Sequence, residues 1–199
     1  MRGGGWIRAI GLDLDRVAAL DGYPYTIPAV QRLEDEFTLD PAVTFLVGAN
    51  GSGKSTLIEA LAVAVGFNDE SGSDSITFQT RNSTSPLHEA LRVVRDVRRP
   101  PTGVFLRAES LFNLATKVEA LGPEVAQAYG ERGLHDQSHG ESFLSLALPW
   151  FGPNGRYLLD EPEAALSPQG CLALLRRIDD LVDEGGPFII ATHSPLLMA

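Results

Sequence analysis

The clearest chemical signal in the chain is the segment GANGSGKST, residues 48–56. It matches the pattern G-x-x-x-x-G-K-[ST], in which glycines permit backbone torsions and close approaches that a Cβ would block. Successive N–H groups of such a loop can surround a phosphate at the start of a helix, although glycines there can also form a merely flexible loop. We expect Lys54 to reach the β- and γ-phosphates of a nucleotide and the Ser55 hydroxyl to hold Mg²⁺. The predicted nucleotide-binding residues of this segment are Asn50, Gly51, Ser52, Gly53, Lys54, Ser55 and Thr56.

A second candidate is the segment RYLLDEP, residues 156–162, in which three apolar residues lead to two carboxylates. The pattern indicates a buried strand whose carboxyl end carries Asp160 and Glu161, and ligands of open α/β sheets bind at that edge. We expect Asp160 to bind Mg²⁺ opposite Ser55, and Glu161 to orient and polarise an attacking water. The alternative interpretation is an acidic turn that caps the following element.

Two further candidates carry a weaker signal. His193 follows the apolar run 188–191, where a neutral imidazole could contact a γ-phosphate, but such a histidine is also often plain polar surface. Ser138 and Gly140 precede a predicted helix at 141–148. A serine and a glycine at that place offer backbone donors to an anion, or they simply cap the helix.

These residues need a framework in which strands and helices alternate. Apolar runs bounded by glycine, proline and serine predict strands at 7–14, 43–47, 76–79, 104–107, 157–159 and 188–191. Helical spacing and cap residues predict helices at 55–65, 86–99, 109–121, 123–129, 141–148 and 168–184. Strands separated by helices imply a mostly parallel sheet that is covered on both faces, so the predicted fold class is α/β.

The composition is that of a globular protein with its own core: 199 residues, of which 44% are apolar. The single cysteine, Cys171, excludes an internal disulfide and suits a reducing cytoplasm, where we expect the protein to reside. We expect no transmembrane segment, because no apolar run approaches the ~20 residues that span a bilayer. The net charge of −10 argues against coating nucleic acid by charge alone. A local basic cluster, or a solvated helix face, is formed by Arg92, Arg95, Arg98 and Arg99.

Taken in order, the glycine loop, Ser-x-Gly, Asp-Glu-Pro and the late histidine resemble the motifs of ABC-type ATPases. More narrowly, GVFLRAES, SHGESFL, LLDEPEAALSPQ and IIATHSPLL resemble a family of small, stand-alone bacterial predicted ATPases. That family is related to the DNA-repair and chromosome-maintenance branch of the ABC superfamily. The resemblance covers nearly the whole chain. It implies a single P-loop NTPase domain over residues 1–199, with an N-terminal β element and a small helical subdomain at 80–135.

The resemblance also implies roles for individual residues. Lys54 and Ser55 would hold the phosphates and Mg²⁺, Asp160 would be the magnesium-side carboxylate, and Glu161 the catalytic base. His193 would be the switch histidine. The signature residues of this superfamily bind the γ-phosphate held by the opposite subunit, and here they would be Ser138 and Gly140. The protein would therefore form a homodimer on binding ATP.

Two positions stay open within the resemblance. An aromatic upstream of the loop usually stacks on adenine, and Tyr23 and Tyr25 are both placed for it. The residue of the glutamine loop, a further metal ligand, is either Gln79 or Glu109, of which we favour Glu109. The signature also departs from the usual LSGGQ, because it reads QSHGE, and Ser167 stands where an aspartate is usual.

The sequence therefore predicts Mg²⁺-dependent ATP binding and hydrolysis by a dimer that sandwiches the nucleotide. Closure and opening would drive a conformational change in a partner protein or in DNA. Two alternatives are the nucleotide-binding subunit of a membrane transporter and a nucleotide-gated scaffold with little turnover. A GTPase is disfavoured because the chain has no Asn-Lys-x-Asp guanine motif. A small-molecule kinase is disfavoured because the Ser138 helix would then have no purpose.

Overall fold

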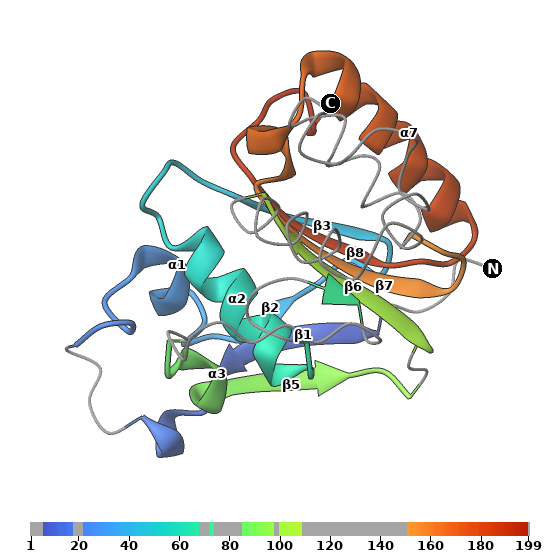
Figure 1. Cartoon of the computed structure of the whole chain (residues 1–199). Helices are drawn as coiled ribbons and strands as arrows, with labels where there is room; N and C mark the ends of the chain where they lie inside the picture. Colours follow the sequence, from blue (N-terminus) through green and yellow to red (C-terminus); the bar gives the residue numbers. More distant parts are fainter. Residues whose placement is uncertain are drawn as a thin grey trace, which may run out of the picture.

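The structure, a computed structural model, describes residues 6–17, 22–67, 72–73, 85–97, 100–108 and 151–198. These residues form two β-sheets with helices packed against them (Figure 1). The larger sheet has the strand order β3-β8-β7-β6-β4. Its strands are β3 (Val43–Val47), β4 (Gly72–Ser73), β6 (Thr102–Arg107), β7 (Gly155–Asp160) and β8 (Phe188–Thr192).

The neighbouring strands β3, β8, β7 and β6 are parallel, and β4 pairs antiparallel with β6. The predicted α/β fold with a mostly parallel sheet is thus confirmed. Parallel strands bring their carboxyl ends to one edge of the sheet. In this register Val47 pairs with Thr192, and Asp160 pairs with both Arg107 and Ala191. The ends of β3, β8, β7 and β6 therefore lie side by side.

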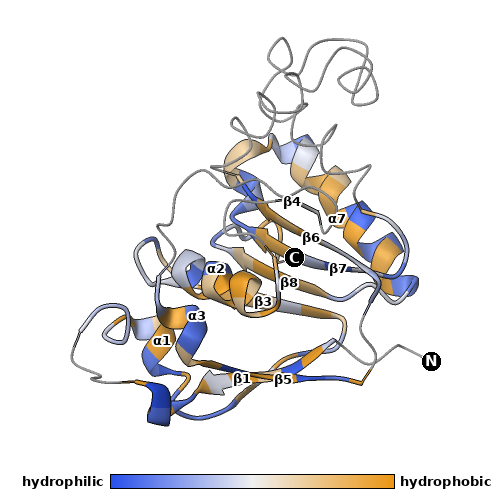
Figure 2. Ribbon diagram, turned by 60° about the horizontal axis from the view of Figure 1, so that its bottom comes forward, coloured by the Kyte–Doolittle hydropathy of each residue, from blue (hydrophilic) through white to orange (hydrophobic). Residues whose placement is uncertain are grey.

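Two helices cover the two faces of this sheet (Figure 1). They are α2 (Lys54–Ala64) and α7 (Pro168–Asp183). Every residue of β7 is buried, and its side chains alternate between the two faces. Tyr157 and Leu159 pack in one hydrophobic cluster with Leu174 of α7, whereas Leu158 packs in the other with Leu61 of α2. In Figure 2 hydrophobic and hydrophilic residues alternate along α7, as expected for a helix with one face on the sheet and one in solvent.

A second, antiparallel sheet lies on the far side of α2, so that this helix is held between two sheets (Figure 1). Its order is β2-β1-β5, with β1 (Ile7–Leu12), β2 (Phe37–Thr38) and β5 (Leu91–Arg95). This sheet is the N-terminal β element that the sequence predicted. Its buried residues Ile7 and Ile10 join the cluster around α2, which explains why α2 is apolar around most of its circumference.

The predicted helix at 86–99 is wrong. Only α3 (Leu87–Ala90) is helical, and the chain then enters β5. Within β5, Val93 pairs with Ile10 and Val94 with Ala9 of β1. β-branched residues favour a pleated strand over a helix, and the antiparallel partner far away in sequence stabilises that choice.

Three short elements complete the secondary structure of the described residues. They are η1 (Leu14–Arg16), α1 (Pro28–Gln31) and η3 (Pro162–Ala165). Ser167, which stands where an aspartate is usual, begins α7: its Oγ accepts a hydrogen bond from the Gly170 N–H at 3.1 Å. Such a cap stabilises a helix by about 1 kcal/mol.

Within the range 80–135, predicted as a helical subdomain, the structure describes residues 85–97 and 100–108, which contain the short helix α3 and the strands β5 and β6. The rest of this range, 80–84, 98–99 and 109–135, lies outside the described residues. Within the described part of the chain, no helix is long and apolar enough to cross a membrane.

Candidate functional site

The phosphate loop connects the end of β3 to the start of α2 and is shaped by its glycines. Gly51 and Gly53 have φ values of +79° and +93°, which side-chain-bearing residues rarely adopt. A Cβ on Gly48 would lie 2.7 Å from Ser52 Oγ, and one on Gly53 would lie 1.9 Å from Ile27 Cγ2. The loop therefore forms a cradle that a Cβ would fill, at the positive end of an 11-residue helix, and it suits a phosphate.

Lys54 lies across this loop with only 5% of its side chain exposed. Its ammonium donates hydrogen bonds to the carbonyl oxygens of Gly48 at 2.8 Å and Ala49 at 3.2 Å. The same Nζ is 3.3 Å from Glu161 Oε1. The predicted phosphate-binding lysine and the predicted base therefore form an ion pair.

Ser55 and Asp160, far apart in sequence, meet between α2 and β7. The Ser55 hydroxyl donates a hydrogen bond to Asp160 Oδ1 at 2.9 Å, and Asp160 is 5% exposed. A hydroxyl and a carboxylate oxygen are hard ligands of the kind that Mg²⁺ prefers. These two residues thus fit the metal that the sequence predicted for them.

Arg107, at the end of β6, is a neighbour of this pair that sequence reasoning did not single out. Its NH1 is 2.9 Å from Glu59 Oε2 of α2, and its Nε is 3.3 Å from Asp160 Oδ2. All three side chains are less than a fifth exposed. The guanidinium therefore links the helix after the phosphate loop to the strand that carries Asp160. The only sequence signal for it was its place at the end of an apolar strand.

Glu161 directly follows β7 and has a left-handed backbone, with φ at +47°. Its N–H donates to the Ala191 carbonyl of β8 at 2.9 Å, which holds the turn against the next strand. A carboxylate-bearing residue adopts this conformation at some cost, and such strain is concentrated at functional sites. The turn places the Glu161 side chain between Lys54 and His193.

His193 follows β8 and is 43% exposed at the same edge of the sheet. Its Nδ1 is 3.6 Å from Glu161 Oε1 and 3.4 Å from Glu163 Oε1. Glu163 was not predicted as a site residue. It is 9% exposed, and only its place two residues after Glu161 could have indicated it.

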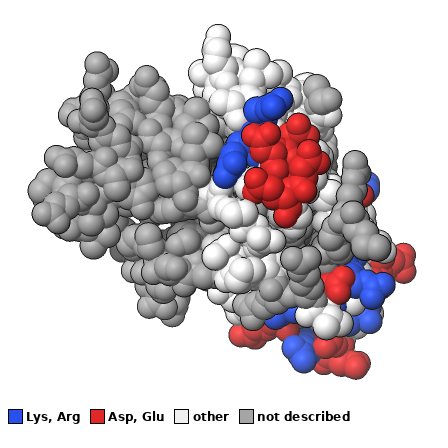
Figure 3. Space-filling model, turned by 90° about the vertical axis from the view of Figure 1, so that its right-hand side faces the viewer, with Lys and Arg blue, Asp and Glu red and all other residues white. Residues whose placement is uncertain are grey.

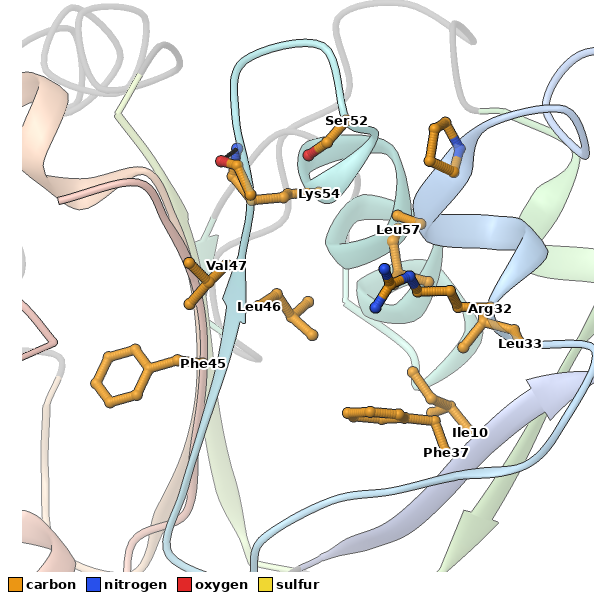
Figure 4. A pocket seen from close by; sticks show the side chains of 13 residues that line it. Ile10, Arg32, Leu33, Phe37, Phe45, Leu46, Val47, Ser52, Lys54 and Leu57 are labelled. Atoms are coloured by element: carbon orange, nitrogen blue, oxygen red, sulfur yellow. Dashed lines mark hydrogen bonds between the residues drawn. The ribbon is translucent and has the colours of Figure 1, made fainter. Parts of the chain in front are cut away.

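A cavity of about 420 Å³ lies beneath the phosphate loop, between β3 and the segment that contains α1 (Figure 4). Ser52 and Lys54 lie at its upper end, and Ile10 and Phe37 at its lower end. The loop consequently depends on contacts from the α1 segment beside the cavity. One such contact is the hydrogen bond from the Ala29 N–H to the Ser52 carbonyl, at 3.2 Å.

The structure thus brings Lys54, Ser55, Asp160, Glu161 and His193 to one edge of the sheet. Asn50, Gly51, Ser52 and Gly53 form the loop itself, and Thr56 lies in the first turn of α2. Tyr23 is 68% exposed, whereas Tyr25 packs against the core around α2, and which of them stacks on adenine stays a prediction. The other predicted site residues lie outside the described residues: Gln79, Glu109, Ser138 and Gly140.

Comparison with known proteins matches this chain to an AAA domain and to ATP-binding proteins. A family profile described as "AAA domain, putative AbiEii toxin, Type IV TA system" matches residues 43–101. The cytochrome c biogenesis ATP-binding export protein CcmA of Rhodopseudomonas palustris is 31% identical over 169 residues, which cover 77% of this chain and 79% of CcmA. The cobalt import ATP-binding protein CbiO of Salmonella typhimurium is 30% identical over 189 residues, which cover 83% of this chain and 66% of CbiO.

Among solved structures, the SMC head domain from Thermotoga maritima matches with a TM-score of 0.46 and 15% identity, over 82% of this chain and 84% of that one. The identity and coverage of the match to CcmA decide the family: the chain belongs to the ABC-type ATPases. It is therefore an ATPase that uses ATP with Mg²⁺, as the sequence predicted.

Proposed function

We propose that the chain works as a homodimer that sandwiches ATP and converts its hydrolysis into a conformational change in a partner protein or in DNA. The observation that carries the proposal is the convergence of the phosphate loop, Asp160, Glu161 and His193 at one edge of the sheet. The side chains of Glu161 and His193 are 27% and 43% exposed. A second subunit could therefore cover them.

In this proposal each residue has a separate task. Lys54 binds the phosphates, and Ser55 and Asp160 hold Mg²⁺, which neutralises charge on the phosphate oxygens. Glu161 accepts a proton from the attacking water, and His193 contacts the γ-phosphate side. Because Glu161 is paired with Lys54, a γ-phosphate that attracts the ammonium would free the carboxylate for the water. Binding and activation of the base would then be coupled.

In the proposed dimer, the signature residues of one subunit complete the nucleotide site of the other. Ser138 and Gly140 of one subunit would contact the γ-phosphate bound to Lys54 of the other. Glu109 is proposed as a further ligand on the metal side, and residues 1–199 as a single ABC-type domain. We also propose a cytoplasmic location, which suits a protein whose single cysteine, Cys171, is unpaired and buried.

A first test uses Glu161→Gln, which keeps the shape of the side chain but removes the base. We expect turnover to fall by about 100-fold or more, because general bases contribute that much. The variant should accumulate as a dimer in ATP but not in ADP, as measured by light scattering. Wild-type rates of hydrolysis in the variant would remove Glu161 from the base role.

A second test asks whether each site is built from two subunits. Lys54→Ala and Ser138→Arg subunits should each be inactive alone. In a mixed dimer one site carries both changes and the other carries neither, so mixing should restore about a quarter of the wild-type activity. Mixing two preparations of Lys54→Ala is the control. Failure of the mixture to recover activity would contradict the shared site.

One alternative has a specific observation in its favour, because the names of CcmA and CbiO describe export and import ATP-binding proteins. This chain would then be the nucleotide-binding subunit of a transporter, and it should co-purify with a membrane subunit. The segment LLDEPEAALSPQ argues against this alternative. A nucleotide-gated scaffold would instead hydrolyse ATP slowly whatever is added to it.

Rates of ATP hydrolysis measured with and without double-stranded DNA distinguish a DNA partner from a protein partner. Figure 3 shows acidic side chains gathered on the side of the molecule where α7 ends, with Asp179, Asp180, Asp183 and Glu184. This acidic group repels a polyanion, so a DNA contact belongs away from it. A DNA-stimulated rate that falls steeply with added salt would support DNA as the partner.

A further inference from the structure

Glu163 connects the two turns that carry the predicted base and the predicted switch histidine. It lies in η3, two residues after Glu161, and its side chain reaches the end of β8. Its Oε1 accepts a hydrogen bond from the Thr192 hydroxyl at 2.5 Å and another from the His193 N–H at 2.9 Å. One carboxylate oxygen thus binds two consecutive residues of a neighbouring loop.

The same oxygen also faces the imidazole. His193 Nδ1 is 3.4 Å from Glu163 Oε1 and 3.6 Å from Glu161 Oε1. A ring nitrogen that lies between two carboxylates is the one that carries a proton, because an unprotonated nitrogen would repel both. This geometry favours the tautomer with its proton on Nδ1, which would leave Nε2 for the nucleotide or water.

The hydrogen bonds extend beyond the histidine. The Thr192 hydroxyl, which donates to Glu163, accepts from the Ser194 N–H at 3.0 Å. Thr192 is fully buried, so this chain of bonds is shielded from competing water. The backbone on both sides of His193 is consequently fixed through Glu163.

Burial of this carboxylate is costly, which argues against an incidental cap. Glu163 is 9% exposed, while its neighbour Glu161 is 27% exposed. Its second oxygen, Oε2, is buried and has no hydrogen-bond partner among the described residues. A neutral side chain could accept the same backbone bond without that desolvation cost. The negative charge of Glu163 has a role where the carboxylate faces the imidazole of His193.

We propose that Glu163 is a positioning residue for His193: it fixes the 192–194 turn, holds the proton on Nδ1 and keeps the ring within reach of the Glu161 carboxylate. The inference rests on the proposed function in so far as His193 contributes to hydrolysis. The arrangement of the imidazole is a separate property, and it can be measured without turnover.

The test compares Glu163→Ala, Glu163→Gln and Thr192→Val with the wild type. In Glu163→Ala, kcat should fall by about 10- to 100-fold with little change in KM for ATP, because the catalytic group is misplaced rather than the substrate. Glu163→Gln keeps a carbonyl oxygen for Thr192 and His193, so it should recover part of kcat. Thr192→Val should lose less than Glu163→Ala.

The second readout is the tautomer of His193, measured by ¹⁵N NMR on histidine-labelled protein, with His193→Ala to assign the signal. We expect protonation at Nδ1 in the wild type and a shift toward Nε2 in Glu163→Ala. Glu184→Ala, at an exposed carboxylate beyond α7, is the matched control and should change neither readout. Melting temperatures identify variants that simply unfold.

The outcomes separate the two proposals. An unchanged tautomer and unchanged kcat in a folded Glu163→Ala variant would overturn the positioning role. A shifted tautomer with wild-type kcat in both Glu163→Ala and His193→Ala would confirm the positioning and remove His193 from the reaction. A lower melting temperature alone, with the tautomer unchanged, would show that Glu163 acts only as a cap.

Discussion

Arg107 shows how single residues tie the site to the fold. Its guanidinium lies between Glu59 of α2 and Asp160 of β7, at 2.9 and 3.3 Å, and is 19% exposed. Arginine suits this position because its planar fork can serve two carboxylates at once. Asp160, the carboxylate proposed to hold Mg²⁺, is thus fixed from the side opposite to Ser55.

We expect Arg107→Met to lower the free energy of unfolding by about 2–3 kcal/mol, because two largely buried carboxylates lose the cation between them. Urea unfolding measures this change. Arg176→Met is the matched control: Arg176 is 78% exposed and pairs with Asp180 on the surface of α7, so its loss should cost less than about 0.5 kcal/mol. Equal costs for the two variants would contradict a special role of Arg107.

At the scale of elements, the phosphate loop is held by the segment that contains α1. Ile27 occupies the space that a Cβ on Gly53 would need, and the Ala29 N–H binds the Ser52 carbonyl. Pro28 and Ala29 of the same segment also line the cavity beneath the loop. The shape of the loop therefore depends on an element outside the motif.

Gly53→Ala should weaken nucleotide binding by about 10-fold or more, since it combines a left-handed backbone with a direct clash against Ile27. Titration with a fluorescent ATP analogue measures the affinity. Gly185→Ala is the control, because its φ is +87° but nothing lies near its Cβ. It should cost about 1 kcal/mol of stability and leave the affinity unchanged. A similar loss of affinity in both variants would show that the clash is irrelevant.

On the scale of the whole molecule, the larger sheet separates two hydrophobic clusters. The cluster under α7 contains stacked aromatic rings: Tyr157 and Phe188 have centroids 4.4 Å apart, and Phe151 meets both edge-on. The Tyr157 hydroxyl donates to the Gly152 carbonyl inside this cluster. Burial raises the pKa of Tyr157 from its ordinary value near 10 to about 12, an effect that the nearby Arg177 partly offsets.

This pKa predicts a loss of stability in alkali. Below pH 10 Tyr157 is protonated in both the folded and the unfolded chain, so it adds no pH dependence. Between about pH 10 and 12 the unfolded chain releases the proton while the folded chain keeps it, and unfolding becomes easier by up to about 2–3 kcal/mol. Urea unfolding across this range should show a smaller decline for Tyr157→Phe. Equal losses of stability in the wild type and in Tyr157→Phe would contradict the assignment of this effect to Tyr157.

The sequence predicted well wherever structure follows from local patterns. The apolar run before the phosphate loop and the run that ends in Asp160 are both strands, and α2 and α7 follow their predicted ranges within a residue or two. The β5 segment was predicted as a helix because its partner, β1, lies about 80 residues earlier, and such pairing leaves no local signal.

In the site, too, contacts between residues far apart in the sequence could not be predicted. Motifs indicated Lys54, Ser55, Asp160 and Glu161, because each motif is contiguous. The ion pair of Arg107 with Glu59 spans 48 residues, and the hydrogen bond of Glu163 with Thr192 spans 29. Neither pair has a contiguous pattern, since the fold alone brings their members together.

The register of the parallel strands has a consequence for how this chain tolerates change. Arg107, Asp160, Ala191 and Leu46 stand at matched positions of four neighbouring strands, which are spaced by about 4.8 Å. The pairing of the strands thus fixes the spacing of the residues that follow each strand. Connections between strands can lengthen or shorten without altering that spacing, whereas a one-residue shift inside any of the four strands would misplace the whole row.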